Sequence, residues 1–288
     1  MRLLVTALLV PELLAAQRLA ARPVDAIRTG AFQDPDIRES SGIAPSRRFS
    51  RVLYTINDSD NDPISGRSLG RWVVPRVRNR DWEAIASAPS SGGSCLYLGD
   101  LGDNDERHPS VTTYRVGEPE HLELFRGAAV GDWSPDLDSL TFRYPDGPHD
   151  AEAMWVEATG MIFVVTKGRS GGIRLFRLSG ADVGIGRVPT AELIQVLPIV
   201  PDRDIGRLVT DAASAPDGRR IAIRTYTELY LFPTLPLGKL GAPAVCNLAG
   251  LEPQGEGVAW LDDRRLVLTS EAAPGGGPAP NNVVRCGG

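Results

Sequence analysis

Short apolar segments recur along the chain, separated by turns rich in Gly, Pro, Asn and Asp. The clearest unit joins residues 81–86 to residues 95–100: two carboxylates precede the first apolar segment, and a third ends the second segment. Alternation of apolar and polar positions over such short lengths is typical of strands rather than helices. The unit therefore predicts two antiparallel strands with acidic residues at one end.

The same unit is found five times. Its first strands are expected within residues 39–44, 81–86, 150–155, 210–213 and 254–260, and its second strands within 52–56, 95–100, 161–166, 220–223 and 265–268. Further strands are expected at 111–116, 173–178 and 282–286. Repeats of about 40 to 50 residues with four strands each are typical of a β-propeller. We therefore expect an all-β chain that forms a single β-propeller of five four-stranded blades, or of six if the long third interval hides a degenerate copy.

The two ends of the chain are expected to meet. The last copy has no clear fourth strand, so residues 24–32 are predicted to supply it and to close the ring. Residues 117–138 are rich in Gly, Pro and acids and are interpreted as an insertion on a surface loop. The propeller domain is predicted to span residues 22–288, after an N-terminal segment of residues 1–21.

Composition supports an all-β fold and excludes two classes of partner. The 31 Gly and 23 Pro suit a chain with frequent turns, and 42% hydrophobic residues supply a core. A net charge of -5 without a Lys/Arg run argues against nucleic acid or an anionic membrane as the main partner. We expect a monomer that binds a small anionic substrate or a glycan or peptide ligand.

The N-terminus resembles an export signal. Met1 and Arg2 precede an apolar run from Leu3 to Val10, although Pro11 and Glu12 interrupt the pattern. We expect a secreted or cell-envelope protein, with a short amphipathic segment as the alternative. No other segment has the length of a membrane span.

The three cysteines are too scattered for a zinc site, which needs close pairs. One disulfide could form, with Cys246 and Cys286 as one candidate pair, and Cys95 would then remain as an odd thiol.

Propeller topology places the acidic residues together. In each blade the first strand lines the central channel and the second strand returns to the face where the first began. Residues that precede first strands or end second strands therefore lie at one mouth of the channel. The candidate metal ligands are Glu39, Asp81, Glu83, Asp150, Glu152, Asp211 and Glu256; the candidate substrate-binding residues are Asn57, Asp58, Asp100, Asp103, Asn104 and Glu271; the candidate catalytic residues are His149, Lys167 and Arg224.

Carboxylates that converge on a channel raise one another's pKa values unless a cation offsets their charge. Ca²⁺ suits such a site, because it accepts six to eight oxygen ligands. A metal beside Lys167 and Arg224 would suit hydrolysis of a phosphate ester or lactone, with the cations stabilising developing negative charge. The sequence thus predicts a Ca²⁺-dependent hydrolase, and the alternative is a non-catalytic module that binds a glycan, a peptide or an envelope protein.

Structural roles compete with these functional ones. Acids before an inner strand can accept hydrogen bonds from backbone amides of the next blade and so hold the ring together. His149, beside Asp150, is a candidate general base, although a single loop histidine is often just exposed to solvent. Trp82, Trp155 and Trp260 adjoin the first strands and are expected to pack between blades.

Several motifs resemble those of a known protein family. Residues 81–86 (Asp-Trp-Glu-Ala-Ile-Ala) and 99–104 (Gly-Asp-Leu-Gly-Asp-Asn) are the most specific, and the likeness spans residues 36 to 272. They resemble a family of secreted bacterial β-propellers. More distantly, the Asp-x-Glu segments are similar to esterase-like phytase and gluconolactonase-type propellers, which implies axial carboxylates, Ca²⁺ and a hydrolase activity.

Overall fold

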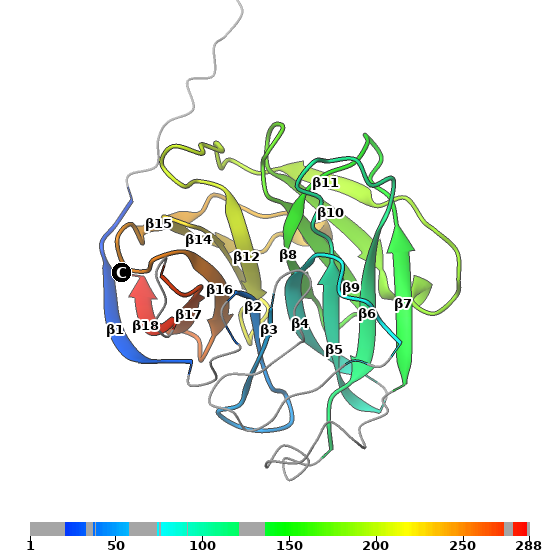
Figure 1. Cartoon of the computed structure of the whole chain (residues 1–288), viewed down its shortest axis with the longest axis horizontal. Helices are drawn as coiled ribbons and strands as arrows, with labels where there is room; N and C mark the ends of the chain where they lie inside the picture. The colour runs from blue at the N-terminus through cyan, green and yellow to red at the C-terminus, as the bar shows by residue number, and fades with distance from the viewer. Residues whose placement is uncertain are drawn as a thin grey trace, which may run out of the picture.

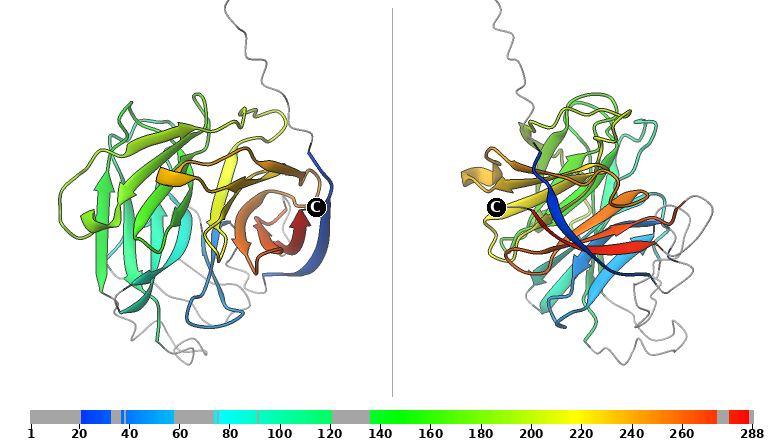
Figure 2. Two further views of the ribbon diagram at one scale, coloured as in Figure 1. Left: turned by 180° about the vertical axis from the view of Figure 1, so that it is seen from behind. Right: turned by 90° about the vertical axis from the view of Figure 1, so that its left-hand side faces the viewer.

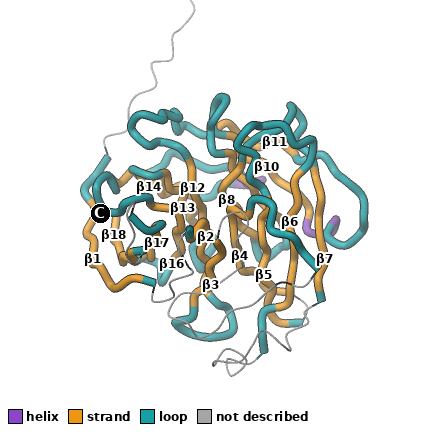
Figure 3. The backbone as a smooth tube through the Cα atoms, in the orientation of Figure 1, coloured by secondary structure: helices purple, strands orange, loops and turns teal. Residues whose placement is uncertain are grey.

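The computed structural model describes residues 21–32, 37, 39–57, 74, 76–90, 92–120, 136–273 and 279–286. Strands dominate this part of the chain (Figure 3), and its helical content is limited to two short 3₁₀ turns, Gly180–Asp182 and Pro236–Gly238. No helix in these ranges is long and apolar enough to cross a membrane. The prediction of an all-β propeller is confirmed.

Four antiparallel four-stranded sheets form the blades, which are arranged around a central axis (Figure 1). Blade A contains β4 (Trp82–Ser90), β5 (Gly93–Asp100), β6 (Val111–Gly117) and β7 (Leu137–Phe142). Blade B contains β8 (Ala151–Val156), β9 (Met161–Thr166), β10 (Arg174–Ser179) and β11 (Glu192–Val196). Blade C contains β12 (Val209–Ser214), β13 (Arg220–Thr225), β14 (Glu228–Pro233) and β15 (Ala244–Asn247). Blade D contains β16 (Gly255–Trp260), β17 (Leu266–Ser270), β18 (Pro280–Cys286) and β1 (Val24–Ala31).

The first sequence copy forms a smaller sheet. β2 (Ser40–Pro45) and β3 (Leu53–Asn57) pair only with each other, and β2 lies between β16 and β4. The prediction of five four-stranded blades, or six, is therefore wrong, because the described residues form four. Between Asn57 and Trp82 the described residues add no strand to this sheet, and residues 58–73 lie outside the described part.

The chain ends are joined as predicted. β1 pairs antiparallel with β18 and completes blade D, so the first and last described strands lie side by side (Figure 2). A disulfide links Cys246 of β15 to Cys286 of β18, with Cα atoms 5.8 Å apart, and Cys95 is free. The ring is thus closed both by strand pairing and by a covalent bond between blades C and D.

The core lies between adjacent sheets. Met154 and Ala84 belong to the cluster between blades A and B, and Phe163 and Phe232 belong to that between blades B and C. Trp260 of β16 is 3% exposed and donates its indole N–H to the carbonyl of Ala213 on β12, at 3.1 Å. Its predicted role in packing between blades is confirmed, and each sheet is stabilised mainly by its neighbours.

A β-bulge interrupts the start of every innermost strand. The register shifts between Ser40 and Gly42, and the four other inner strands shift at their equivalent positions. A bulge leaves an extra residue unpaired and re-aims its side chain. The residues set apart in this way are Ser41, Glu83, Glu152, Thr210 and, in a longer bulge, Glu256 with Gly257.

Candidate functional site

A buried ion pair lies at the bulged ends of the inner strands. The Nζ atom of Lys167, one residue beyond β9, is 2.5 Å from Oε1 of Glu152 in the bulge of β8. The two residues are 7% and 2% exposed. The backbone N–H of Lys167 donates to the carbonyl of Asp150 at 2.8 Å, which continues the β8–β9 ladder and fixes the start of the lysine side chain.

Three further side chains surround this pair. Glu83 and Glu256 occupy the bulges of β4 and β16 and are each 4% exposed. The ring of Tyr226 lies 5.9 Å from the Lys167 ammonium, and Gln254 donates to Oε1 of Glu256 at 3.1 Å. We call Glu83, Glu152, Lys167, Tyr226 and Glu256 the mouth cluster.

The ionisation of the mouth cluster follows from burial and mutual charge. Burial alone would lower the pKa of Lys167, but the negative charge of Glu152, with further contributions from Glu83 and Asp150, outweighs burial and raises the pKa above its ordinary value. Burial, together with the charge of Glu152, raises the pKa of Glu256 well above its ordinary value, and Lys167 offsets this only in part. The site therefore holds a cationic lysine, a carboxylate paired with it and a second carboxyl group that favours its protonated form.

A second polar network borders the mouth cluster. Asp150 is fully buried, accepts from the guanidinium of Arg169 and receives the backbone N–H of Asp103 at 2.9 Å. Arg169 also donates to Asn104, and Nδ1 of His108 lies 3.0 Å from Oδ1 of Asp103. Arg169 and His108 thus connect three of the predicted residues, Asp103, Asn104 and Asp150.

Asp211 lies apart from the mouth cluster. Because of the bulge, Thr210 occupies the position equivalent to Glu83. Its hydroxyl donates to the carbonyl of Glu256 at 3.0 Å. Asp211 instead accepts the backbone N–H of Val258 on blade D and that of Ala212, both at 2.8 Å. Alignment on apolar residues alone therefore misplaced this strand by one residue. The hydrogen bond from Val258 shows that Asp211 joins blades C and D.

Arg224 is also used within the fold. Its side chain is fully buried, pairs with Glu252 at 2.8 Å and donates to the carbonyl of Gly257 at 2.9 Å. A Cβ atom on Gly255 would lie 1.7 Å from its Nη2, so this close approach requires glycine. Because Arg224 precedes the last residue of β13, whereas Lys167 follows the end of β9, the two are not equivalent.

The remaining predicted residues are distributed around the same face. The Nε2 atom of His149 lies 2.9 Å from Oδ1 of Asp146, and its ring packs against Tyr144 and Phe176. Asp100 accepts the backbone N–H of Asp81 at 2.9 Å, and burial raises its pKa. Asn57 is buried at the end of β3, and Glu39 is exposed before β2. Glu271 follows β17 and adds to the negative charge near Glu256. Asp58 lies outside the described residues.

Tyr226 and Gln254 were missed by the sequence prediction, although a signal existed for Tyr226. Lys167, Tyr226 and Glu271 each lie one residue beyond the second strand of a repeat, directly after Thr166, Thr225 and Ser270. The position of Lys167 therefore predicts that of Tyr226, once the strand ends are aligned instead of the charges.

The side chains do not assemble into the predicted metal site. In the described ranges, no group of three or more His, Cys, Asp or Glu side chains is arranged to hold a metal ion. The Lys167 ammonium lies against Glu152, where a cation shared by the glutamates would be expected. The donor set therefore does not fit Ca²⁺, and calcium binding stays a prediction.

Comparisons with known proteins support the fold. No protein-family model matches the chain, and the search of curated proteins found no match. The PQQ-bound aldose sugar dehydrogenase of Streptomyces coelicolor is similar with a TM-score of 0.52 and 13% identity, over 93% of this chain and 100% of that one. At this identity the likeness concerns the fold alone.

Gluconolactonase-type propellers are also among the similar structures. The enzyme of Xanthomonas campestris has a TM-score of 0.39 and 14% identity, over 82% of this chain and 66% of that one. The periplasmic gluconolactonase of Pseudomonas aeruginosa has a TM-score of 0.38 and 8% identity, over 88% of this chain and 67% of that one. At these TM-scores neither adds to the argument on function.

Proposed function

We propose that the chain is a hydrolase of a lactone or similar uncharged cyclic ester, with the mouth cluster as its active site. The proposal rests on one observation: Glu152 is paired with Lys167 at 2.5 Å, while the pKa of Glu256 beside them is raised well above its ordinary value. Two carboxyl groups in environments that favour opposite protonation states are suited to act as base and acid.

Hydrolysis needs three functions, and the cluster contains a group for each. The Glu152 carboxylate would take a proton from water as the water oxygen attacks the carbonyl carbon. The Lys167 ammonium would stabilise the resulting oxyanion. Protonated Glu256 would give its proton to the ring oxygen as the carbon–oxygen bond breaks, leaving a hydroxy acid. Proton exchange with water then restores both glutamates.

The charge of the site favours a neutral substrate over a phosphate ester. Glu83 and Glu152 lie near Lys167, the nearby cation Arg169 is already paired with Asp150, and Glu271 and Glu152 both raise the pKa of Glu256. A phosphate dianion would add further negative charge to this environment, whereas an uncharged ester would not. Of the two substrate classes suggested by the sequence, the lactone is therefore the better candidate.

Proton release in a pH-stat tests the proposal. The native protein is expected to hydrolyse one or more of a panel of γ- and δ-lactones and to leave p-nitrophenyl phosphate unchanged. Glu256→Gln and Glu152→Gln should each lower kcat at least about 100-fold, the usual contribution of a general acid or base. The matched control is Glu120→Gln, which changes an exposed acid.

Two results would overturn the proposal. One is a panel in which no lactone is hydrolysed above its rate in buffer. The other is hydrolysis that continues at the native rate in both mouth-cluster variants. Binding of a glycan or peptide without turnover would favour the non-catalytic alternative, and repeating the assay with added Ca²⁺ tests the metal dependence predicted from the sequence.

A further inference from the structure

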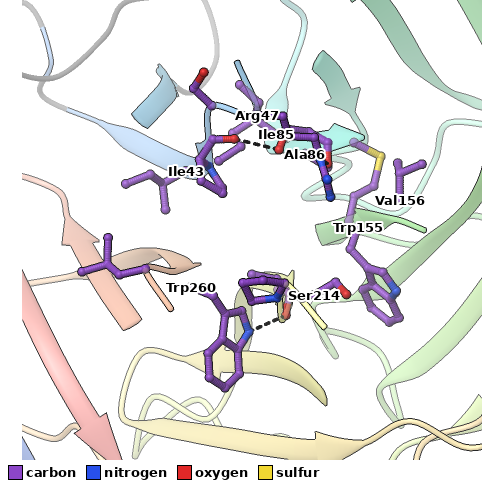
Figure 4. A pocket seen from close by; sticks show the side chains of 17 residues that line it. Ile43, Arg47, Ile85, Ala86, Trp155, Val156, Ser214 and Trp260 are labelled. Atoms are coloured by element: carbon purple, nitrogen blue, oxygen red, sulfur yellow. Dashed lines mark hydrogen bonds between the residues drawn. The ribbon is translucent and has the colours of Figure 1, made fainter. Parts of the chain in front are cut away.

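A cavity lies at the end of the inner strands opposite the mouth cluster. It has a volume of about 290 Å³ and is lined by the C-terminal halves of β2, β4, β8, β12 and β16 (Figure 4). Ser87 at this cavity is four residues beyond Glu83 on β4, which corresponds to about 13 Å along a strand. The channel therefore has two mouths of different chemistry, and the mouth cluster occupies only one.

The walls of this cavity combine polar and apolar surface in about equal parts. Ile43 and Ile85 lie on one side, and Trp155 and Trp260 lie across the open space from them (Figure 4). Both indoles are held in place, Trp155 by stacking on Phe163 with ring centroids 5.0 Å apart and Trp260 by its hydrogen bond to blade C. Both tryptophans are only 3% exposed, so they fix the shape of the cavity wall, and a wall of fixed shape with apolar and polar groups is typical of sites for small organic ligands.

One charge faces this surface. Among the lining side chains that the structure describes, Arg47 is the single charged residue, and no acid accompanies it. Its Nε donates to the carbonyl of Ser87 at 3.1 Å, which orients the guanidinium at the edge of the cavity. Within the described part of the chain, no hydrogen bond or ion pair uses its two Nη groups.

The acid nearest to Arg47 is occupied elsewhere. Glu118 accepts hydrogen bonds from the hydroxyls of Ser46 and Ser94, from Tyr54 at 3.1 Å and from the backbone N–H of Arg47. This carboxylate fixes the loop that carries Arg47 without pairing with the guanidinium itself. Two parallel N–H groups of a guanidinium match a carboxylate or sulfonate in bidentate geometry.

We propose that this cavity is a second ligand site, which binds a small aromatic or apolar molecule bearing one negative charge. The ring would occupy the open space at the ends of the inner strands, and the anionic group would pair with the Nη groups of Arg47. The size of the cavity suits a ligand of one or two rings. This site is separate from the mouth cluster and does not depend on the proposed hydrolase activity.

Calorimetric titration with 2-naphthoate tests the site, with 2-naphthamide as the uncharged analogue of the same shape. We expect saturable binding of the carboxylate and at least tenfold weaker binding of the amide. Arg47→Gln should weaken naphthoate binding at least tenfold, and Ser214→Leu, which adds carbon at the cavity wall, should do the same. Arg48→Gln, a change at the adjacent exposed arginine, is the matched control and should bind normally.

Several outcomes would overturn the proposal. They are the absence of binding heat up to millimolar naphthoate, equal affinity for the amide, and unchanged binding in both Arg47→Gln and Ser214→Leu. Circular dichroism and thermal melts of the variants separate lost binding from lost folding. Because the titration measures binding in the absence of a lactone, its failure would leave the proposed hydrolase untouched.

Discussion

The Lys167 ammonium and the Glu152 carboxylate form a buried ion pair at the end of the channel, with their charged atoms 2.5 Å apart. Removing one partner of a buried pair costs about 3–5 kcal/mol when the other charge is left without compensation. Glu83 still offsets part of the Lys167 charge, so we expect Glu152→Gln to lower the free energy of unfolding by an amount up to this range, as measured by urea denaturation.

The double variant Glu152→Gln, Lys167→Met provides the decisive comparison. Since it removes both charges, it should recover most of the lost stability. Lys239→Met, at an exposed lysine, serves as the control. A double variant no more stable than Glu152→Gln would show that the pair is not the source of the effect.

The pKa of Glu256 predicts a pH dependence of stability. A carboxyl group whose pKa is higher in the folded than in the unfolded state stabilises the fold fully below its ordinary pKa. This contribution is lost as pH rises through the folded-state pKa, and the loss is about 1.4 kcal/mol for every unit by which the folded and unfolded pKa values differ. Glu256→Gln mimics the protonated form, so it should be close to native stability at acidic pH and more stable than native at alkaline pH. Denaturation at a series of pH values from 4 to 9 measures this difference, and a constant difference would contradict the prediction.

Asp211 should prove structural. Asp211→Asn retains the size of the side chain but turns an acceptor into a donor that faces the backbone N–H of Val258 or Ala212. An unsatisfied buried group costs about 1–3 kcal/mol, so the midpoint of denaturation should fall accordingly. Asp263→Asn, at an exposed turn, should leave it unchanged. If the Asp211 variant were as stable as the native protein, this acid would have no role in joining blades C and D.

The disulfide should contribute substantially to stability. It links residues 40 positions apart, and closing a loop of this length stabilises by about 4 kcal/mol through the unfolded state. We expect Cys246→Ser, Cys286→Ser to lose about that much in guanidinium denaturation. Cys95→Ser is the control for loss of a thiol, and equal effects of the two changes would refute the assignment.

Calcium binding predicted from the sequence can be tested through Lys167. Lys167→Ala leaves the glutamates of the mouth cluster without their cation, which makes them available to a hard divalent ion. Millimolar Ca²⁺ should raise the Tm of this variant by more than that of the native protein, since a bound ligand stabilises the folded state. Equal shifts, or none, would count against competition between lysine and metal.

The sequence was sufficient to predict most elements that line the channel. Apolar alternation located the first two strands of each repeat, and the missing fourth strand of the last copy correctly indicated pairing with residues 24–31. Strands β7, β11, β14 and β15 were not predicted. Exposed edge strands such as Glu192–Val196 lack a clear apolar face, whereas Glu228–Pro233 has buried apolar residues and was overlooked. The smaller first sheet was not predicted either, since its two strands carry the same pattern as a full blade.

The sequence predicted where the candidate site lies, but it predicted only some of the contacts between its side chains. Acids before inner strands did lie at one end of the channel, and Glu83, Glu152 and Glu256 occupy equivalent bulges. A bulge adds one residue to one strand, and this insertion leaves no mark in composition or periodicity. For this reason Asp211 was placed where Thr210 lies, and Arg224 was treated as equivalent to Lys167.

The pairing of β1 with β18 also has a consequence for synthesis of the protein. β1 is translated before all the other described strands, and its partner is the last of them to be made. Until β18 is available, β1 remains an unpaired strand and blade D is incomplete. Contacts of such high sequence separation form slowly. Blades A, B and C can assemble on the nascent chain, whereas closure of the ring must follow translation of β18.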